Sequence, residues 1–163
     1  MASSSAMMTH LDLASSSRES APSKPPGSRV KLSSLKVLKT IGTGTFARVH
    51  LCQSRSEERE FFALKILSAA DVIRLKQVEH VKNEKAILNE VSHPFLVPLL
   101  DWTKDEKNLY MVFPFVPGGE LFSHLRSTGR FTVPQAQFYS VEIVAALEYL
   151  HSLSIVYRDL KVS

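Results

Sequence analysis

Hydrophobic and polar positions follow two successive patterns from residue 35 onward. Short runs rich in β-branched and aromatic residues, bounded by glycine or charged turns, predict an antiparallel β-meander. The five predicted strands are Leu35–Ile41, Arg48–Gln53, Phe61–Leu67, Phe95–Trp102 and Leu109–Phe115. Between the third and fourth strands, from Asp71 to about Glu90, the apolar spacing becomes helical. Ser92-His93-Pro94 ends this helix, because the residue before a proline avoids the α region.

After a break at Pro117-Gly118-Gly119 the pattern predicts helices. A short helix is expected from Glu120 to Arg126, and Thr132-x-x-Gln135 has the form of a capping box for a long helix that runs to about Ser152. The long helix is apolar on nearly every face, which is typical of a helix enclosed by other elements. No other element of this sequence is predicted to cover it, so we expect an aggregation-prone protein. The fold class predicted is α+β, with a five-stranded antiparallel sheet and a helix followed by further helices.

Residues 1–34 differ from the rest of the chain. They are rich in Ser and Pro and show no sustained hydrophobic period, so they bury too little surface to offset the entropy of ordering. We interpret them as a disordered leader, followed by one domain at 35–163. A Ser-rich transit peptide is an alternative, weakened by the acidic Asp12 and Glu19.

Charge and cysteine content limit the compartment and the partners. The net charge of +4 comes from the first forty residues, and the remaining acidic and basic residues cancel, so no nucleic-acid partner is expected. Cys52 is the only cysteine, which fits a reducing compartment and a buried strand position. No apolar run is long enough to span a membrane. We therefore expect a cytoplasmic or nuclear protein.

The stretch Gly42-x-Gly44-x-x-Ala47 lies between two predicted strands. Glycine folds into tight or left-handed turns at little cost, and the exposed N–H groups of such a turn bind anionic oxygens. An ordinary hairpin turn is an equal alternative on this motif alone. A dinucleotide-binding enzyme is excluded, because its glycine motif must open a helix.

Two later residues favour the phosphate-binding interpretation. Lys65 lies on the third predicted strand and Glu84 on the helix that follows. This order is expected for a loop that covers the phosphates of ATP, a lysine that reaches them and a carboxylate that holds the lysine in place.

On these residues the chain resembles the protein kinase family, and within it the cAMP-dependent kinases of the AGC group. The matching segments are Gly42 to Phe46, Phe62 to Lys65, Ser92 to Leu96, Val116 to Phe122 and Tyr157 to Lys161. The resemblance implies an N-lobe at 35–115, a hinge at 114–120 and the first helices of a C-lobe at 120–163.

The resemblance assigns catalytic roles to Asp159, Lys161, Lys65 and Glu84. Asp159 would accept the proton of the substrate hydroxyl, and Lys161 would steady the γ-phosphate, as in serine/threonine kinases. Arg158 would pair with a phosphorylated activation loop; the alternative, a surface ion pair with its neighbour, is disfavoured by the upstream matches.

The resemblance to the kinase family also assigns an ATP site. The residues implied are Ile41, Gly42, Thr43, Gly44, Thr45, Phe46, Ala47, Val49, Ala63, Lys65, Phe113, Pro114, Val116 and Glu120. Pro114 stands where an acidic residue is usual, but it keeps the carbonyl that would accept from adenine. Ala47 replaces a third glycine, so we expect weakened rather than lost ATP binding. Glu120 would meet the ribose and an arginine of basic substrates.

The function implied is transfer of the γ-phosphate of ATP, with Mg²⁺, to Ser or Thr of basic protein substrates, with a regulatory subunit as a further partner. The magnesium ligands of the family follow Lys161 and are not in this sequence, so no metal ligand is expected here and we expect the chain to be inactive as given. The alternative is a catalytically dead fragment that acts as a decoy for nucleotide or for regulators.

Overall fold

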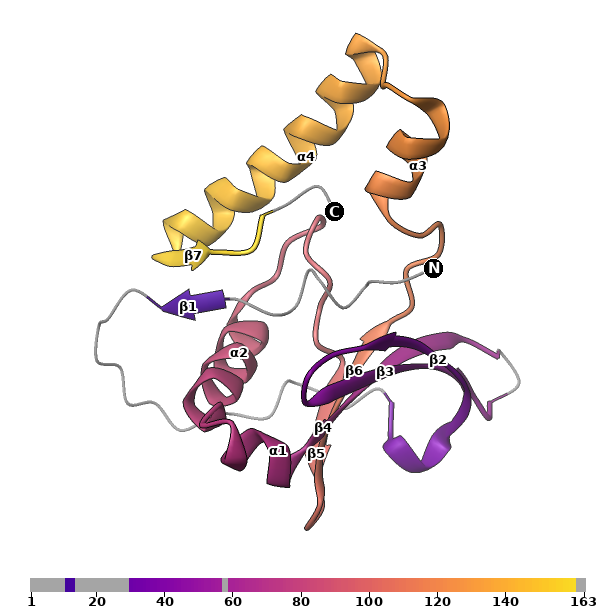
Figure 1. Ribbon diagram of the computed structural model, residues 1–163, viewed down its shortest axis with the longest axis vertical. Coiled ribbons are helices and arrows are strands. Elements are labelled where there is room, and N and C mark those ends of the chain that lie inside the picture. Colours follow the sequence, from indigo (N-terminus) through magenta and orange to yellow (C-terminus); the bar gives the residue numbers. More distant parts are fainter. Residues whose placement is uncertain (1–10, 14–29, 57–58, 161–163) are drawn as a thin grey trace.

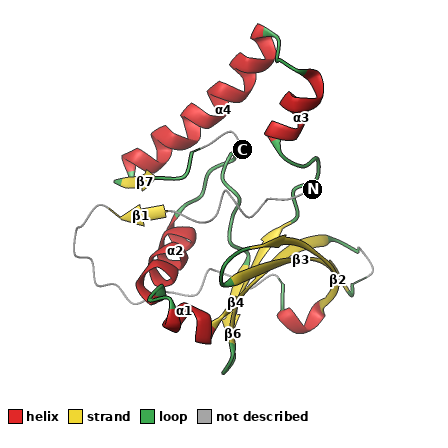
Figure 2. Cartoon of the chain, viewed as in Figure 1, coloured by secondary structure: helices red, strands yellow, loops and turns green. Residues whose placement is uncertain are grey.

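The computed structural model describes residues 11–13, 30–56 and 59–160. Its main feature is a five-stranded antiparallel sheet with the order β2-β3-β4-β6-β5 (Figure 1). These strands are β2 (Leu35–Thr43), β3 (Ala47–Ser54), β4 (Phe61–Ser68), β5 (Asp101–Lys104) and β6 (Asn108–Pro114). The helices lie beside the sheet and above it rather than alternating with its strands (Figure 2). This arrangement confirms the predicted α+β fold class.

The predicted fourth strand is wrong over most of its length. Residues 95–100 form no strand, and β5 begins only at Asp101. Pro98 lies inside the predicted run, and a proline cannot donate to a strand ladder. The first hydrogen bond to β6 comes just before β5, where the N–H of Leu100 donates to the carbonyl of Val112 at 2.8 Å.

The single helix expected from Asp71 to Glu90 is two helices, α1 (Ala69–Arg74) and α2 (Val78–Glu90). Lys76, between them, has a φ of +55°. The N–H of Lys76 donates to Ile73 and that of Gln77 to Val72, which is the double hydrogen bond of a Schellman helix end. Glycine usually occupies the left-handed position of this motif, so the lysine gave no signal for the break.

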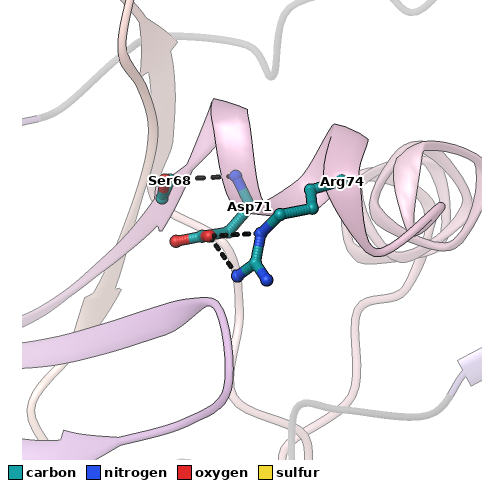
Figure 3. Close-up of polar contacts among 3 residues, drawn as sticks. All are labelled: Ser68, Asp71 and Arg74. Carbon is teal, nitrogen blue, oxygen red and sulfur yellow. Dashed lines mark hydrogen bonds and ion pairs between the residues drawn. The ribbon is translucent and has the colours of Figure 1, made fainter.

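The start of α1 is capped by Ser68, the last residue of β4. Its hydroxyl accepts a hydrogen bond from the N–H of Asp71 at 3.3 Å, and the Asp71 carboxylate accepts two from the Arg74 guanidinium, at 2.6 and 3.2 Å (Figure 3). The Arg74 and Ser68 hydrogen bonds lower the pKa of Asp71. An anionic side chain in the first turn and a cation in the last also suit the helix dipole.

Each face of the sheet carries a hydrophobic cluster. The first cluster joins the sheet to α1 and α2, and its buried members are Val49, Ala63, Leu67, Val72, Val81, Leu88, Leu99, Met111 and Phe113. The second lies on the opposite face, and its buried members are Val30, Leu35, Cys52, Phe62, Leu64 and Val112. Period-two alternation along β3 and β4 separates the two sets.

The C-terminal part comprises α3 (Leu121–Thr128), α4 (Val133–Ser152) and β7 (Ile155–Tyr157). The capping box predicted at Thr132 and Gln135 is present. A third cluster of Ile87, Val91, Leu150 and Ile155 joins α4 and β7 to α2. No helix of the described chain is long and apolar enough to cross a membrane.

The side chains of α4 are not all enclosed. Val133, Phe138, Val141 and Val144 are each more than three-fifths exposed. The sequence predicted a helix that is apolar on nearly every face and that the rest of this chain does not cover, and within the described residues these side chains are uncovered.

Parts of the predicted leader are ordered elements. Leu11–Leu13 forms strand β1, and Leu32–Ser34 forms the short 3-10 helix η2. Val30 is 8% exposed and belongs to the second cluster. At these residues the structure has local elements that the sequence did not predict, because backbone pairing and a single buried valine need no hydrophobic period. Residues 1–10 and 14–29 lie outside the described chain.

Candidate active site

The glycine stretch forms a tight turn between β2 and β3. The N–H of Gly44 donates to the carbonyl of Ala47 at 2.7 Å, which leaves Thr45 and Phe46 as the tip. The N–H groups of these two tip residues donate to no described residue. Adjacent unpaired N–H groups at a turn are suited to bind an anionic oxygen.

Left-handed backbone is not the reason for glycine in this turn. The described glycines with positive φ are Gly118, Gly119 and Gly129, so Gly42 and Gly44 are not among them. A Cβ on Gly44 would lie 3.6 Å from the carbonyl oxygen of Ala47, an ordinary contact. Nothing inside the turn therefore demands glycine at 44.

Lys65 and Glu84 form a buried ion pair. The Nζ atom of Lys65 donates to Oε1 of Glu84 at 2.6 Å, and the two residues are 3% and 8% exposed. Lys65 projects from β4 toward α2, on the face of the first cluster, where its cross-strand neighbours are Val49 and Met111. The expected pairing of these two side chains is present, and their catalytic roles stay predictions.

Apolar residues predicted for the ATP site share the first cluster. Val49, Ala63 and Phe113 are buried members, and Ile41 and Phe46 pack against them. The structure thus brings the glycine turn, the two flanking strands and the Lys65 strand to one face of the sheet. This face is apolar around a single buried charge pair, as a site for a flat, uncharged ring beside phosphates would be.

The predicted hinge residues lie at the end of β6 and beyond it. Pro114 is the last residue of β6, and the N–H of Phe115 donates to Phe61 at 3.3 Å. Val116 is 53% exposed, so its backbone lies in an open segment. Glu120 is the N-cap residue of α3, and its carbonyl accepts from Ser123 at 3.1 Å.

Asp159 follows the end of β7 by two residues and is half-buried. Tyr157, just before it, packs on the third cluster rather than the first. Burial raises the pKa of the Tyr157 hydroxyl, and the negative charge of Asp159 raises it further. Arg158 is exposed, and Lys161 lies outside the described residues.

The model of the protein kinase domain matches residues 35–163. The chain belongs to the protein kinase family. It is similar to cAMP-dependent protein kinase catalytic subunit 3 of Drosophila melanogaster, with 58% identity over 80% of this chain and 22% of the relative. It is also similar to the human cAMP-dependent protein kinase catalytic subunit PRKX, with 59% identity over 80% of this chain and 36% of the relative.

A third relative is the human putative serine/threonine-protein kinase PRKY, with 54% identity over 84% of this chain and 49% of the relative. This kinase chain thus spans between about a fifth and a half of the length of these three relatives. The family membership agrees with the resemblance found in the sequence.

The kinase chain also has a cleft on the other side of its glycine turn. The cleft is about 390 Å³ in volume and is lined by residues 44–47 together with Arg48, His50, Ser68 and Asp71 (Figure 3 shows the last two). Arg48 and His50 project to the face opposite Lys65, since they alternate with Val49 along β3. The glycine turn therefore borders this cleft, and its residues Phe46 and Ala47 also pack against the first cluster.

Sequence reasoning missed the link between α4 and the end of α2. The N–H of Ser92 donates to the hydroxyl of Tyr149 at 2.9 Å, and the ring of Tyr149 stacks on His93 with centroids 5.1 Å apart. The available signal was Tyr149 itself, which is half-buried next to the buried Leu150, because a tyrosine packed among apolar residues usually needs a partner for its hydroxyl.

Proposed function

We propose that this protein is an ATP-dependent serine/threonine kinase of the AGC group, similar to the cAMP-dependent kinases, acting on protein substrates with basic residues near the target Ser or Thr. The observation that carries the proposal is the buried Lys65–Glu84 ion pair beside a glycine turn with unpaired N–H groups. A lysine held in this way is suited to position phosphates, and positioning is most of phosphoryl-transfer catalysis.

The ATP would be held between the glycine turn and the first cluster. The tip N–H groups and Lys65 would contact the phosphates, and the apolar wall would contact adenine. The carbonyl of Pro114 and the N–H of Val116 would hydrogen-bond the adenine edge. These assignments are supported by the family membership and by the shared face of the residues involved.

Asp159 would accept the proton of the substrate hydroxyl as that oxygen attacks the γ-phosphate, with Lys161 beside the transferred group. Glu120 would attract an arginine of the substrate. Mg²⁺ accompanies ATP in protein kinases. Among the described residues no group of three or more His, Cys, Asp or Glu is placed to hold a metal, so no ligand is assigned.

A regulatory subunit and a cytoplasmic or nuclear location belong to the same proposal. The names of the relatives support the first, and the single cysteine supports the second.

The test has two arms, ATP binding by calorimetry and transfer of labelled phosphate to peptides. One peptide carries two arginines before a serine, a second carries two glutamates there, and a third has tyrosine in place of the serine. For the 163-residue chain itself we expect ATP binding without transfer, because the magnesium ligands of the family follow Lys161. When the chain is extended by the magnesium-binding segment and C-lobe of a relative, we expect transfer to the first peptide alone and its loss in Asp159→Asn, with the exposed Glu106→Gln as the control. Binding without transfer by the extended protein would favour the decoy alternative, and absence of both would refute the proposal.

A further inference from the structure

Strand β7 presents a backbone edge outside the main sheet. It is three residues long and pairs with none of the five main strands. Its first residue, Ile155, is fully buried in the third cluster with Ile87 and Leu150. That packing fixes β7 against α2 and α4, but it does not satisfy the N–H and C=O groups of the strand. An extended segment can pair with these groups along the strand edge.

The described segment on this edge is β1. It pairs antiparallel with β7 in the register Leu11 to Tyr157, Asp12 to Val156 and Leu13 to Ile155. It also lies beside α2, as Figure 1 shows. The segment is thus in contact with two elements that are more than sixty residues apart in the sequence.

We propose that the edge of β7 is a strand-addition site for an extended peptide and that its occupant is the chain's own leader segment, Leu11–Leu13. Main-chain hydrogen bonds supply the attraction in this mode of recognition. The pairing ties the leader to α2, which bears Glu84, and to the segment that leads into Asp159. The leader therefore holds both elements in one arrangement and releases them when it leaves.

Covalent attachment favours the leader over a free peptide. A two-stranded ribbon of this length is marginally stable by itself. Residues 14–29 connect Leu13 to Val30, which is 8% exposed in the second cluster. A tether raises the effective concentration of the segment to about the millimolar range. A free peptide of the same sequence would need a comparable concentration to displace it.

Oxidative cross-linking tests the register. In a Cys52→Ala background, Asp12→Cys is combined with Val156→Cys, because opposed residues of an antiparallel pair have Cα atoms about 4.5–5.5 Å apart, within the range of a disulfide. The matched control combines Ser16→Cys with Val156→Cys. We expect the first pair to close within one chain at least about ten-fold faster than the control. Equal rates, or disulfides only between chains, would overturn the proposal.

Hydrogen exchange tests the hydrogen bonds. The double variant Leu11→Pro/Asp12→Pro removes a backbone N–H donor from the β1–β7 ladder. Hydrogen-bonded and non-hydrogen-bonded pairs alternate along an antiparallel ladder, so one of these two neighbouring residues donates to β7. We expect the amides of 155–157 to exchange at least about ten-fold faster in this variant, and at the wild-type rate in the control Ser15→Pro/Ser16→Pro. Protection of β4 reports that the sheet is intact. Unchanged exchange at 155–157 contradicts the proposal.

Both experiments measure strand pairing without any phosphate transfer. Their failure would leave the proposed kinase activity standing, and an inactive protein would leave the strand-addition site standing.

Discussion

Replacement of Lys65 by Met tests the buried ion pair on which the candidate site is built. Methionine keeps the apolar stem and removes the ammonium, so the carboxylate of Glu84 loses the partner that lies 2.6 Å away. The Glu84 side chain is 11% exposed, so water cannot fully replace the lost contact. Removing one member of a buried pair destabilises a protein by about 3–5 kcal/mol.

Lys65→Met is therefore expected to lower the free energy of unfolding by about 3–5 kcal/mol. This is a large part of the total for a small domain, which is typically about 5–15 kcal/mol.

The assay is urea unfolding at low protein concentration, followed by tryptophan fluorescence. Trp102 is the only tryptophan in the chain, and Lys85 Nζ lies 2.8 Å from its ring centroid. A double-mutant cycle with Glu84→Leu isolates the pairwise contribution. The double variant should recover most of the loss, since apolar replacement of both partners of a buried pair is often neutral.

The matched control is the exposed pair on the same helix. Lys82 Nζ lies 2.8 Å from Oε1 of Glu79, with side chains 66% and 75% exposed. Lys82→Met is expected to cost less than about 1 kcal/mol. If Lys65→Met costs no more than this control, or if the double variant recovers nothing, the reasoning from burial is refuted.

Three further predictions concern other contacts. Tyr149→Phe removes the acceptor for the N–H of Ser92 and should cost about 1 kcal/mol in the same urea assay; no change would deny the link a structural role. The Tyr110 hydroxyl and two backbone amides lower the pKa of Asp105, so its carboxylate stabilises the fold above about pH 4. This contribution is lost as pH falls through the lowered pKa, and the gap in melting temperature between wild type and Asp105→Asn should close in acid. Ala47→Gly should tighten ATP binding by calorimetry, and an unchanged Kd would count against a restraining role for the methyl group.

The parts of the fold that the sequence predicted are those with a local cause. The capping box at Thr132 and Gln135 involves residues three apart, and the alternation along β3 and β4 reports burial on the two faces of one sheet. The break between α1 and α2 also has a local cause, the left-handed Lys76. It was missed because lysine carries no preference for that conformation.

No local sequence pattern indicates the pairing of β1 with β7. Leu13 and Ile155 are opposed in space but lie at the two ends of the chain, and a three-residue run is too short to show a period. The contact of Tyr149 with Ser92 is likewise a meeting of residues far apart in the sequence. Such contacts depend on where complete elements dock.

The same contrast between local and long-range causes applies to the predicted site. Lys65 and Glu84 were paired from the sequence through their resemblance to a known order of residues, and the geometry of α2 explains why the pair forms. Glu84 falls between Val81 and Leu88 at helical spacing, and both are buried in the first cluster. Packing of that apolar stripe therefore directs the carboxylate at the sheet.

Helix α2 is consequently the element on which the candidate site depends. One stripe of the helix docks on the sheet and carries Glu84 to Lys65, while Ile87 and Val91 dock on α4 and β7 in the third cluster. A helix held on two sides by packed clusters cannot shift on one side without disturbing the other. Strand β7, and the leader strand β1 paired with it, therefore contact the same helix that carries Glu84, although β7 pairs with none of the five main strands.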